Sequence, residues 1–521
     1  MKDIELLRKL FAQGLISRRD FLKQMSAWGI GATLAGSLLS NTALAQEAQF
    51  GGHFVMAGNG SSTDSLDPVT YNDFVNSQIG RSLYNRLVYQ NPNGVLVPRL
   101  AVSWDSNDTF DEWHIQLREG VEFHNGKTMT SADVLYSLQR HYGEGTTSGA
   151  AGNLSNIVGI TATGPYELSI SLSSGDIDFM YLLTDYQLMI QPEGSTDDAI
   201  GTGAFILEHF EPGVMAMFRK NPNYWDAPKP YYDSYELLTI NDLNARTTAM
   251  QTGKVHAITN VDPKTVEFLR KSPGITIKDT PSRGHYNFTA RTDTNPFDSP
   301  DLVLAMKYAL PRQQIIDLAL GGFGALGNDH PINAGYALFE NGVAQRELDL
   351  DKARYHYERS GHSGAIELRV ADISWPNAVD GAVLFKESAA KIGMNIEIRR
   401  EPSDGFWNDV WNVQPFYASN WFARATQDQM FTVAYTGNWN DSRFQNEEFS
   451  RLLQEARIEK DQSLRAGMYT RMQQLIHDHS GALIPVYNSH VDAIASNITG
   501  YVGNPSRPLM DQLIQENTWF S

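Results

Sequence analysis

The chain has 521 residues, more than one hydrophobic core usually holds, so two or three domains are expected. Its formal net charge of −18 argues against non-specific nucleic-acid binding, which needs a basic surface. The absence of cysteine excludes disulfides, thiolate metal sites, cysteine nucleophiles and a lipid-modified N-terminal cysteine.

The first 45 residues have the pattern of an export signal. Residues 17–23 read SRRDFLK, which closely resembles the twin-arginine motif, and an uncharged, mildly apolar stretch follows as far as Ala45. Ala43 and Ala45 are small residues at the two positions that a signal peptidase reads. The alternative is an amphipathic cytosolic helix. We expect a twin-arginine signal peptide, cleaved after Ala45, and a mature protein in the periplasm.

Strand and helix signals alternate along the rest of the chain. Strict apolar–polar alternation predicts half-buried strands, while apolar residues at helical spacing and Ser/Thr or Pro at a start predict helices. The expected strands lie at 113–117, 168–172 and 482–486, and the expected helices begin at Thr130 and Ser299 or lie within 449–456 and 464–476. These signals predict a mixed α/β fold.

Three short motifs suggest catalysis or metal binding, but none has the context that the chemistry needs. Gly126-Lys127-Thr128 lacks the glycine-rich cradle of a phosphate-binding loop. The GHSG string at 361–364 precedes an expected strand, whereas a nucleophile elbow follows one. His477-Asp478-His479 has no second ligand cluster nearby and is interpreted as a helix C-terminus. We therefore expect no enzyme, no cofactor and no metal site.

Several stretches together resemble one protein family. The longest is 98–104, 113–127 and 130–134, and shorter matches follow at 66–68, 201–205, 219–225, 296–298 and 484–485. They resemble the extracytoplasmic solute-binding proteins, family 5, of the oligopeptide, dipeptide, nickel and opine ABC importers. Within the long block, Trp104, Trp113, Leu117 and Phe123 are interpreted as strand core and Gly120 and Gly126 as turn glycines, so the block identifies the fold and not the ligand.

The resemblance implies a two-lobed periplasmic binding protein fold with an extra subdomain (cluster C type) and a hinge that closes the lobes over a ligand. By analogy, residues 46–88, 201–295 and 490–521 form lobe I, 89–200 the extra subdomain and 296–489 lobe II. The implied partners are an ABC permease and ATPase complex in the inner membrane. We expect a monomer that binds no nucleic acid.

The resemblance also implies where the ligand is contacted. The loop after the first mature strand supplies Asn59, Ser61 and Ser62, and a second stretch supplies Trp375. Each loop residue could equally belong to a plain turn. The third stretch contains Asn420, Trp421, Phe422 and Arg424, and we further expect contacts from Tyr487 and Asn488. Core packing is the alternative for the aromatic residues.

Arg424 decides the predicted ligand class. Peptide binders of the family have Trp-x-x-Asp where this chain has Trp421-Phe422-Ala423-Arg424, and the Asp takes the peptide ammonium group. They also have an arginine for the peptide carboxylate near Trp375, and this chain has none between Val370 and Phe385. A guanidinium repels an ammonium group and matches a carboxylate or phosphate.

We therefore expect a small anionic organic ligand: an opine, a sugar-phosphate of the agrocinopine type, or a carboxylate-bearing peptide-like compound. Two alternatives stay open for the function: a dipeptide or oligopeptide binder, and a receptor for sensing or a chaperone role without transport. A structural ion pair between Arg424 and Asp428, four residues on, is the alternative for the arginine itself.

Overall fold

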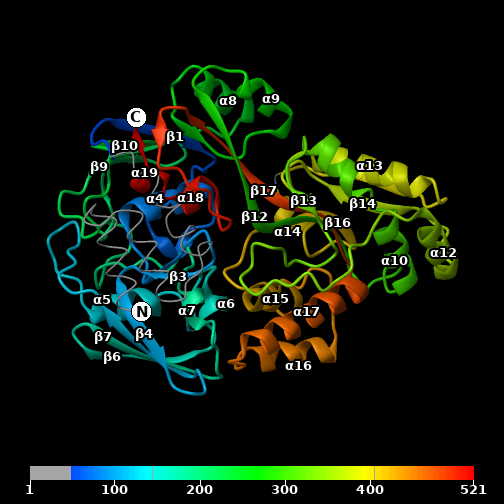
Figure 1. Ribbon diagram of the computed structural model, residues 1–521, viewed down its shortest axis with the longest axis horizontal. Coiled ribbons are helices and arrows are strands. Elements are labelled where there is room, and N and C mark those ends of the chain that lie inside the picture. The colour runs from blue at the N-terminus through cyan, green and yellow to red at the C-terminus, as the bar shows by residue number, and fades with distance from the viewer. Residues whose placement is uncertain (1–47, 144, 404) are drawn as a thin grey trace, which may run out of the picture. The chain divides into compact units, whose positions relative to one another are not determined.

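The computed structural model describes residues 48–143, 145–403 and 405–521 (Figure 1). The predicted signal peptide at 1–45 lies outside the described residues. An eleven-stranded sheet runs through both lobes and a four-stranded sheet lies in the extra subdomain. The fold is the α/β, two-lobed arrangement that the sequence predicts.

The first lobe contains one end of the large sheet. Its strands, in spatial order, are β8 (Phe205–Glu211), β9 (Met215–Lys220), β10 (Ser234–Thr239), β1 (His53–Gly58) and β11 (Ala257–Ile258). Phe54 and Met56 of β1 pack in one hydrophobic cluster, and Val55 and Ala57 pack in another. Because β1 is paired in parallel on both edges and covered on both faces, its sequence is a continuous apolar run.

The other elements of the first lobe come from distant parts of the chain. They are η1 (Pro68–Thr70), α4 (Phe74–Leu83), α8 (Leu243–Gln251), η2 (Pro263–Thr265), α9 (Val266–Arg270), β18 (Ile498–Thr499), α18 (Pro508–Gln512), α19 (Ile514–Asn517) and β19 (Trp519–Phe520).

The second lobe contains the other end of the large sheet, with helices around it. Its strands are β13 (Ala325–Leu326), β14 (Ile366–Val370), β15 (Ile396–Arg400) and β16 (Phe416–Trp421). Its helices are α10 (Pro300–Ala309), α11 (Arg312–Gln314), the π-helix η3 (Ile315–Ala319), α12 (Leu350–Ser360), α13 (Ala378–Ala390), α14 (Phe406–Asp409), α15 (Gln427–Tyr435), α16 (Glu447–Ala456) and α17 (Gln462–His479).

The extra subdomain is built on the family signature. Its four-stranded sheet has the order β4 (Ala101–Ser106), β5 (Glu112–Leu117), β7 (Glu167–Leu172) and β6 (Ile157–Gly164). The hairpin of β2 (Val88–Gln90) and β3 (Leu96–Pro98) precedes it, and α5 (Ser131–Gln139), α6 (Ala151–Leu154) and α7 (Phe179–Leu182) complete it. Trp113, Leu117 and Phe123 are buried in its core, as the sequence predicts, whereas Trp104, the fourth predicted core residue, is only partly buried and packs against that core.

Two long antiparallel strands, β12 (Ile275–Ala290) and β17 (Ala482–Ala495), belong to both lobes. The C-terminal end of β17 pairs with β11 of the first lobe. The C-terminal end of β12 pairs with β16 of the second lobe (Figure 1). Their register shifts between Pro281 and His285. We propose that the lobes hinge there. The part of β12 after His285 then belongs to lobe II, whereas the expected boundary between lobe I and lobe II lay at residue 295.

The three motifs set aside from the sequence lie in ordinary turns and helix ends. Gly126 (φ 81°) is in the turn that joins the bridge partners Glu122 and Thr128. Gly361 (φ 66°) ends α12 in the left-handed conformation. The His477-Asp478-His479 string is the last turn of α17.

Candidate ligand-binding site

The predicted Trp421–Arg424 stretch lies where β12, β16 and β17 meet. Trp421 pairs with His285 of β12, and Gly284 is the residue before His285 in that strand. A Cβ atom on Gly284 would be 2.6 Å from the Trp421 carbonyl oxygen and 2.7 Å from Asn488 Oδ1. Only glycine allows this approach, and it brings the predicted site residues Trp421 and Asn488 together.

Asn420 and Trp421 are fixed by hydrogen bonds within the second lobe. Asn420 Nδ2 donates to the Ser374 carbonyl at 2.5 Å. Trp421 is 6% exposed, packs in a core cluster and donates from Nε1 to Asp441 Oδ2 at 3.2 Å. Its position agrees with the core-packing alternative, whereas Phe422 is 69% exposed.

Asp441 beside Trp421 is a buried carboxyl group whose hydrogen-bond donors are neutral. Thr289 Oγ1 donates to Asp441 Oδ2 at 3.4 Å, in addition to the Trp421 indole. Burial raises the pKa of Asp441 to about 7, against the opposing effect of these donors.

Arg424 follows directly and is only partly buried. Its Nη1 donates weakly to the carbonyls of Phe422 and Ala423, at 3.5 and 3.4 Å, and its guanidinium lies 5.8 Å from the Trp421 ring centroid. Within the described ranges, no carboxylate oxygen lies within 4.0 Å of it. Burial lowers the pKa of Arg424, and Asp185 opposes that effect.

The structural ion pair between Arg424 and Asp428 is not formed. Asp428 instead accepts from Arg457 Nε, at 3.1 Å to Oδ2. The structure therefore leaves Arg424 without the partner that would make it a purely structural residue.

Trp375 and Tyr487 are buried, and Asn488 has an unused acceptor. Trp375 is 2% exposed and stacks on Tyr286, with the ring centroids 5.3 Å apart, so it packs in the core. Tyr487 is 9% exposed and donates to the His330 carbonyl at 2.9 Å. Within the described residues, Asn488 Oδ1 is buried without a hydrogen-bond partner, so it is an unused acceptor at this junction.

The loop with Asn59, Ser61 and Ser62 packs on the first lobe. The Asn59 carbonyl accepts from Val75 N at 3.3 Å, and Ser61 N donates to Asp64 Oδ1 at 3.0 Å. The backbone of Ser62 lies against the turn between β8 and β9. None of these contacts joins the loop to the Arg424 segment.

Arg283 is a central residue that sequence reasoning missed. It is 2% exposed, and it donates to the Ala425 carbonyl at 3.0 Å, to Gln90 Oε1 at 2.6 Å and to Ser506 Oγ. One guanidinium thus joins β12, the second lobe, the extra subdomain and the C-terminal segment. Burial lowers its pKa.

Further arginines lie around the same junction. Arg81 and Arg86 donate to the two oxygens of Asp511, each at 3.1 Å, and burial lowers the pKa of Arg81 to about 9. Asp511 is held by a left-handed turn in which residues 509–512 all have φ between 50° and 65°. Such backbone is strained for non-glycine residues. Arg507 is near enough to lower the pKa of both Arg81 and Arg424 by repulsion. We name Arg81, Arg86, Arg283, Arg424 and Arg507 the arginine cluster.

Comparison with known proteins agrees with this architecture. The model of the family "Bacterial extracellular solute-binding proteins, family 5 Middle" matches residues 95–443. The chain belongs to this family. Its relatives include the glutathione-binding protein GsiB of Escherichia coli (strain K12), 22% identical over 484 residues, which cover 88% of this chain and 94% of that protein.

Solved structures share the fold of this family 5 protein. The periplasmic binding protein DppA from Helicobacter pylori, in complex with the peptide STSA, has a TM-score of 0.78 and 23% identity, covering 90% of this chain and 98% of DppA. AgaA from A. tumefaciens R10, in complex with agropinic acid, has a TM-score of 0.78 and 22% identity, covering 90% and 99%.

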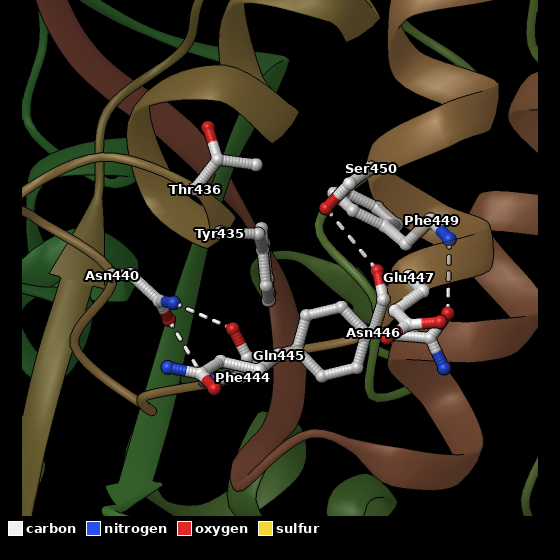
Figure 2. A pocket seen from close by; sticks show the side chains of 9 residues that line it. All are labelled: Tyr435, Thr436, Asn440, Phe444, Gln445, Asn446, Glu447, Phe449 and Ser450. Carbon is white, nitrogen blue, oxygen red and sulfur yellow. Dashed lines mark hydrogen bonds between the residues drawn. The ribbon is translucent and has the colours of Figure 1, made fainter.

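A cavity of about 510 Å³ lies elsewhere in the second lobe of this family 5 protein, between α15 and α16 (Figure 2). Two of its polar side chains are already hydrogen-bonded. Asn440 Nδ2 donates to the Phe444 carbonyl at 2.7 Å, and Asn446 accepts from Phe449 N at 2.9 Å. It contains none of the predicted site residues, so we do not assign the ligand to it.

Two features are absent from the described residues. No helix there is both long and apolar enough to cross a membrane. No group of three or more His, Asp or Glu side chains there could hold a metal ion.

Proposed function

We propose that this protein is the periplasmic binding component of an ABC importer and that it captures a small anionic organic ligand. The lobes close over the ligand, and the closed protein, a monomer, delivers it to a permease and ATPase complex in the inner membrane. Export by the twin-arginine route and cleavage after Ala45 belong to the same proposal. No catalytic step is involved.

The observation that carries the ligand class is Arg424. It is a partly buried cation at the junction of the lobes, and no carboxylate in the described chain lies within 4.0 Å of it. A guanidinium in such a place binds a carboxylate or phosphate with two parallel hydrogen bonds and repels an ammonium group. The arginine cluster adds positive charge, because its arginines outnumber the two acidic groups, Asp511 and Asp185, that act on Arg81 and Arg424.

The relatives support an organic ligand with negative charge. One is named for binding glutathione and one was solved with agropinic acid. The second candidate, a peptide binder, is favoured by DppA, which was solved with the peptide STSA. The two candidates differ in net charge: a dipeptide such as Met-Leu pairs one ammonium group with one carboxylate and is neutral overall, whereas glutathione has two carboxylates and one ammonium group. Arg424 favours the ligand with the surplus negative charge.

Titration calorimetry tests the proposal. The probes are glutathione, agropinic acid, glycerol 3-phosphate and the dipeptide Met-Leu, applied to wild type and to Arg424→Ala. A hydrogen bond to a charged group contributes about 1.5–3 kcal/mol, so the variant should bind an anion roughly tenfold to several hundredfold more weakly. Its melting temperature without ligand should hardly change, because Arg424 has no ion-pair partner within the described chain.

The matched control is Arg118→Ala in the extra subdomain. Arg118 also contacts a backbone carbonyl, that of Arg99 at 3.0 Å, and an indole ring, that of Trp225 at 4.6 Å. The control should bind as wild type. Unchanged binding by Arg424→Ala, or preference of the wild type for Met-Leu over the anions, would refute an anionic ligand at Arg424.

A further inference from the structure

One buried side chain, that of Arg283, binds the chain neighbours of both Arg424 and Arg507. Arg283 donates to the Ala425 carbonyl at 3.0 Å and to Ser506 Oγ, and its backbone N–H donates to the Pro505 carbonyl at 3.1 Å. Ala425 follows Arg424, and Ser506 precedes Arg507. The geometry therefore places two partly buried arginines, one from the second lobe and one from the C-terminal segment, at the same junction.

Arg507 has the same kind of surroundings as Arg424. Its guanidinium lies 4.0 Å from the centroid of the Tyr186 ring, in the extra subdomain. In the part of the chain that the structure describes, no carboxylate oxygen lies within 4.0 Å of it. A guanidinium over an aromatic ring can still donate from its edge, so this contact leaves N–H groups for an anion.

The local charges do not balance. Arg424 and Arg507 are near enough for their repulsion to contribute to the lowered pKa of Arg424. Asp185 opposes this effect, but its Oδ2 accepts from Asn153 Nδ2 and its Oδ1 from Gln187 N, each at 3.0 Å. Arg283 adds a third positive charge whose hydrogen-bond acceptors are all neutral. Like charges in a partly buried site repel, and an anion between them offsets this repulsion by attracting both.

We propose that Arg507 is a second anion-binding residue and that the ligand carries two negative charges, as two carboxylates or as one phosphate monoester. One charge binds Arg424 and the other binds Arg507, beside the Tyr186 ring. This inference rests on the proposed function and makes it more specific: a monoanion satisfies one arginine only, so the site should prefer a dianion. It also gives closure a cause, because the two arginines come from different lobes.

Calorimetry with charge-matched probes tests it. N-acetylglutamate and N-acetylglutamine differ by one carboxylate charge, and glycerol 3-phosphate and inorganic phosphate test the phosphate source. The variants are Arg507→Gln and Arg424→Gln. The control is Arg359→Gln on α12, because Arg359 also lies over a tyrosine ring, 5.4 Å from the Tyr355 centroid.

Wild type should bind a dianion at least tenfold more tightly than the matched monoanion. Arg507→Gln should lower the dianion affinity by tenfold or more and leave the monoanion affinity nearly unchanged, whereas Arg424→Gln should weaken both. Arg359→Gln should bind as wild type. Arg507→Lys keeps the charge but not the planar fork, so an intermediate affinity would exclude simple misfolding of the glutamine variant.

The outcomes separate the inference from the proposed function. If Arg424→Gln weakens binding but Arg507→Gln keeps the full preference for the dianion, Arg507 is not a ligand residue and the proposed function stands. If Arg424→Gln binds every probe as wild type, the proposed anchor is wrong. If wild type binds neither the carboxylates nor the phosphates, both proposals are refuted.

Discussion

Removing one partner of the ion pair between Asp178 and Arg465 should open the protein. Arg465 Nη1 and Nη2 donate to the two oxygens of Asp178, at 3.0 and 2.5 Å. The Asp178 side chain is 9% exposed and the Arg465 side chain is 7% exposed. Asp178 precedes α7 of the extra subdomain, and Arg465 lies on α17 of the second lobe. The pair therefore exists only while these two parts touch.

The magnitude follows from burial. Removing one partner of a buried pair costs about 3–5 kcal/mol, chiefly because the other charge stays buried alone. In Asp178→Asn, Arg465 keeps bonds to the Tyr469 hydroxyl and the Ala456 carbonyl, each at 2.8 Å, which favours the lower end. At about 1.4 kcal/mol per decade, ligand affinity should fall about a hundredfold. Both charges are hydrated once the lobes separate, so the loss acts on the closed form.

Calorimetry and small-angle scattering measure the two consequences, weaker binding and a larger radius of gyration without ligand. The double variant Asp178→Asn/Arg465→Gln should bind better than either single variant, because it buries no unpaired charge. The control is Asp108→Asn, which removes the exposed contact between Asp108 and Lys460 and should change little. Wild-type affinity and an unchanged radius in Asp178→Asn would refute a closing role for the pair.

Three further predictions concern the buried Asp441, the export signal and the closure of the lobes. The folded protein holds a proton on Asp441 up to about pH 7, whereas the unfolded chain releases it near pH 4, so the free energy of unfolding should fall by about 2–4 kcal/mol between pH 4 and pH 8. Denaturant unfolding of Asp441→Asn should not show this fall, and an unaltered pH dependence in that variant would contradict the buried acid. Replacing Arg18 and Arg19 by Lys should leave precursor in the cytoplasm on immunoblots, and normal periplasmic levels would exclude twin-arginine export. Saturating ligand should reduce the radius of gyration, since the ligand favours closure by its differential affinity for that form; an unchanged radius would count against the hinge.

The elements that the sequence predicted are those set by local signals. Ser299 accepts from Leu302 N at the start of α10, and Thr130 and Asp133 form the capping box of α5. Such bonds join residues three positions apart, so the sequence alone carries them. The strand expected at 482–486 extends instead to Ala495, because its outer half is fixed by pairing with β12 and β11, far away in the chain.

The candidate site combines residues with a sequence signal and residues without one. Arg424 stood out because it replaces an acidic residue of a recognisable motif. Arg283 and Arg507 had no such signal: Arg283 contacts Ala425 across 142 positions and Ser506 across 223. Only the fold brings these partners together. Trp375 and Trp421 were expected at the ligand, yet the sequence could not distinguish an aromatic ring in a binding surface from one in a core beside it.

The overall charge and the arginine cluster together restrict what can bind. The protein has a formal charge of −18, so a large polyanion such as nucleic acid meets a repulsive surface. That repulsion is screened within about 8 Å at physiological ionic strength, whereas charges in a partly buried site are screened much less. A small anion that comes between Arg424 and Arg507 therefore responds to those two guanidiniums far more than to the surface. The acidic exterior and the basic junction thus select against large anions and for small ones.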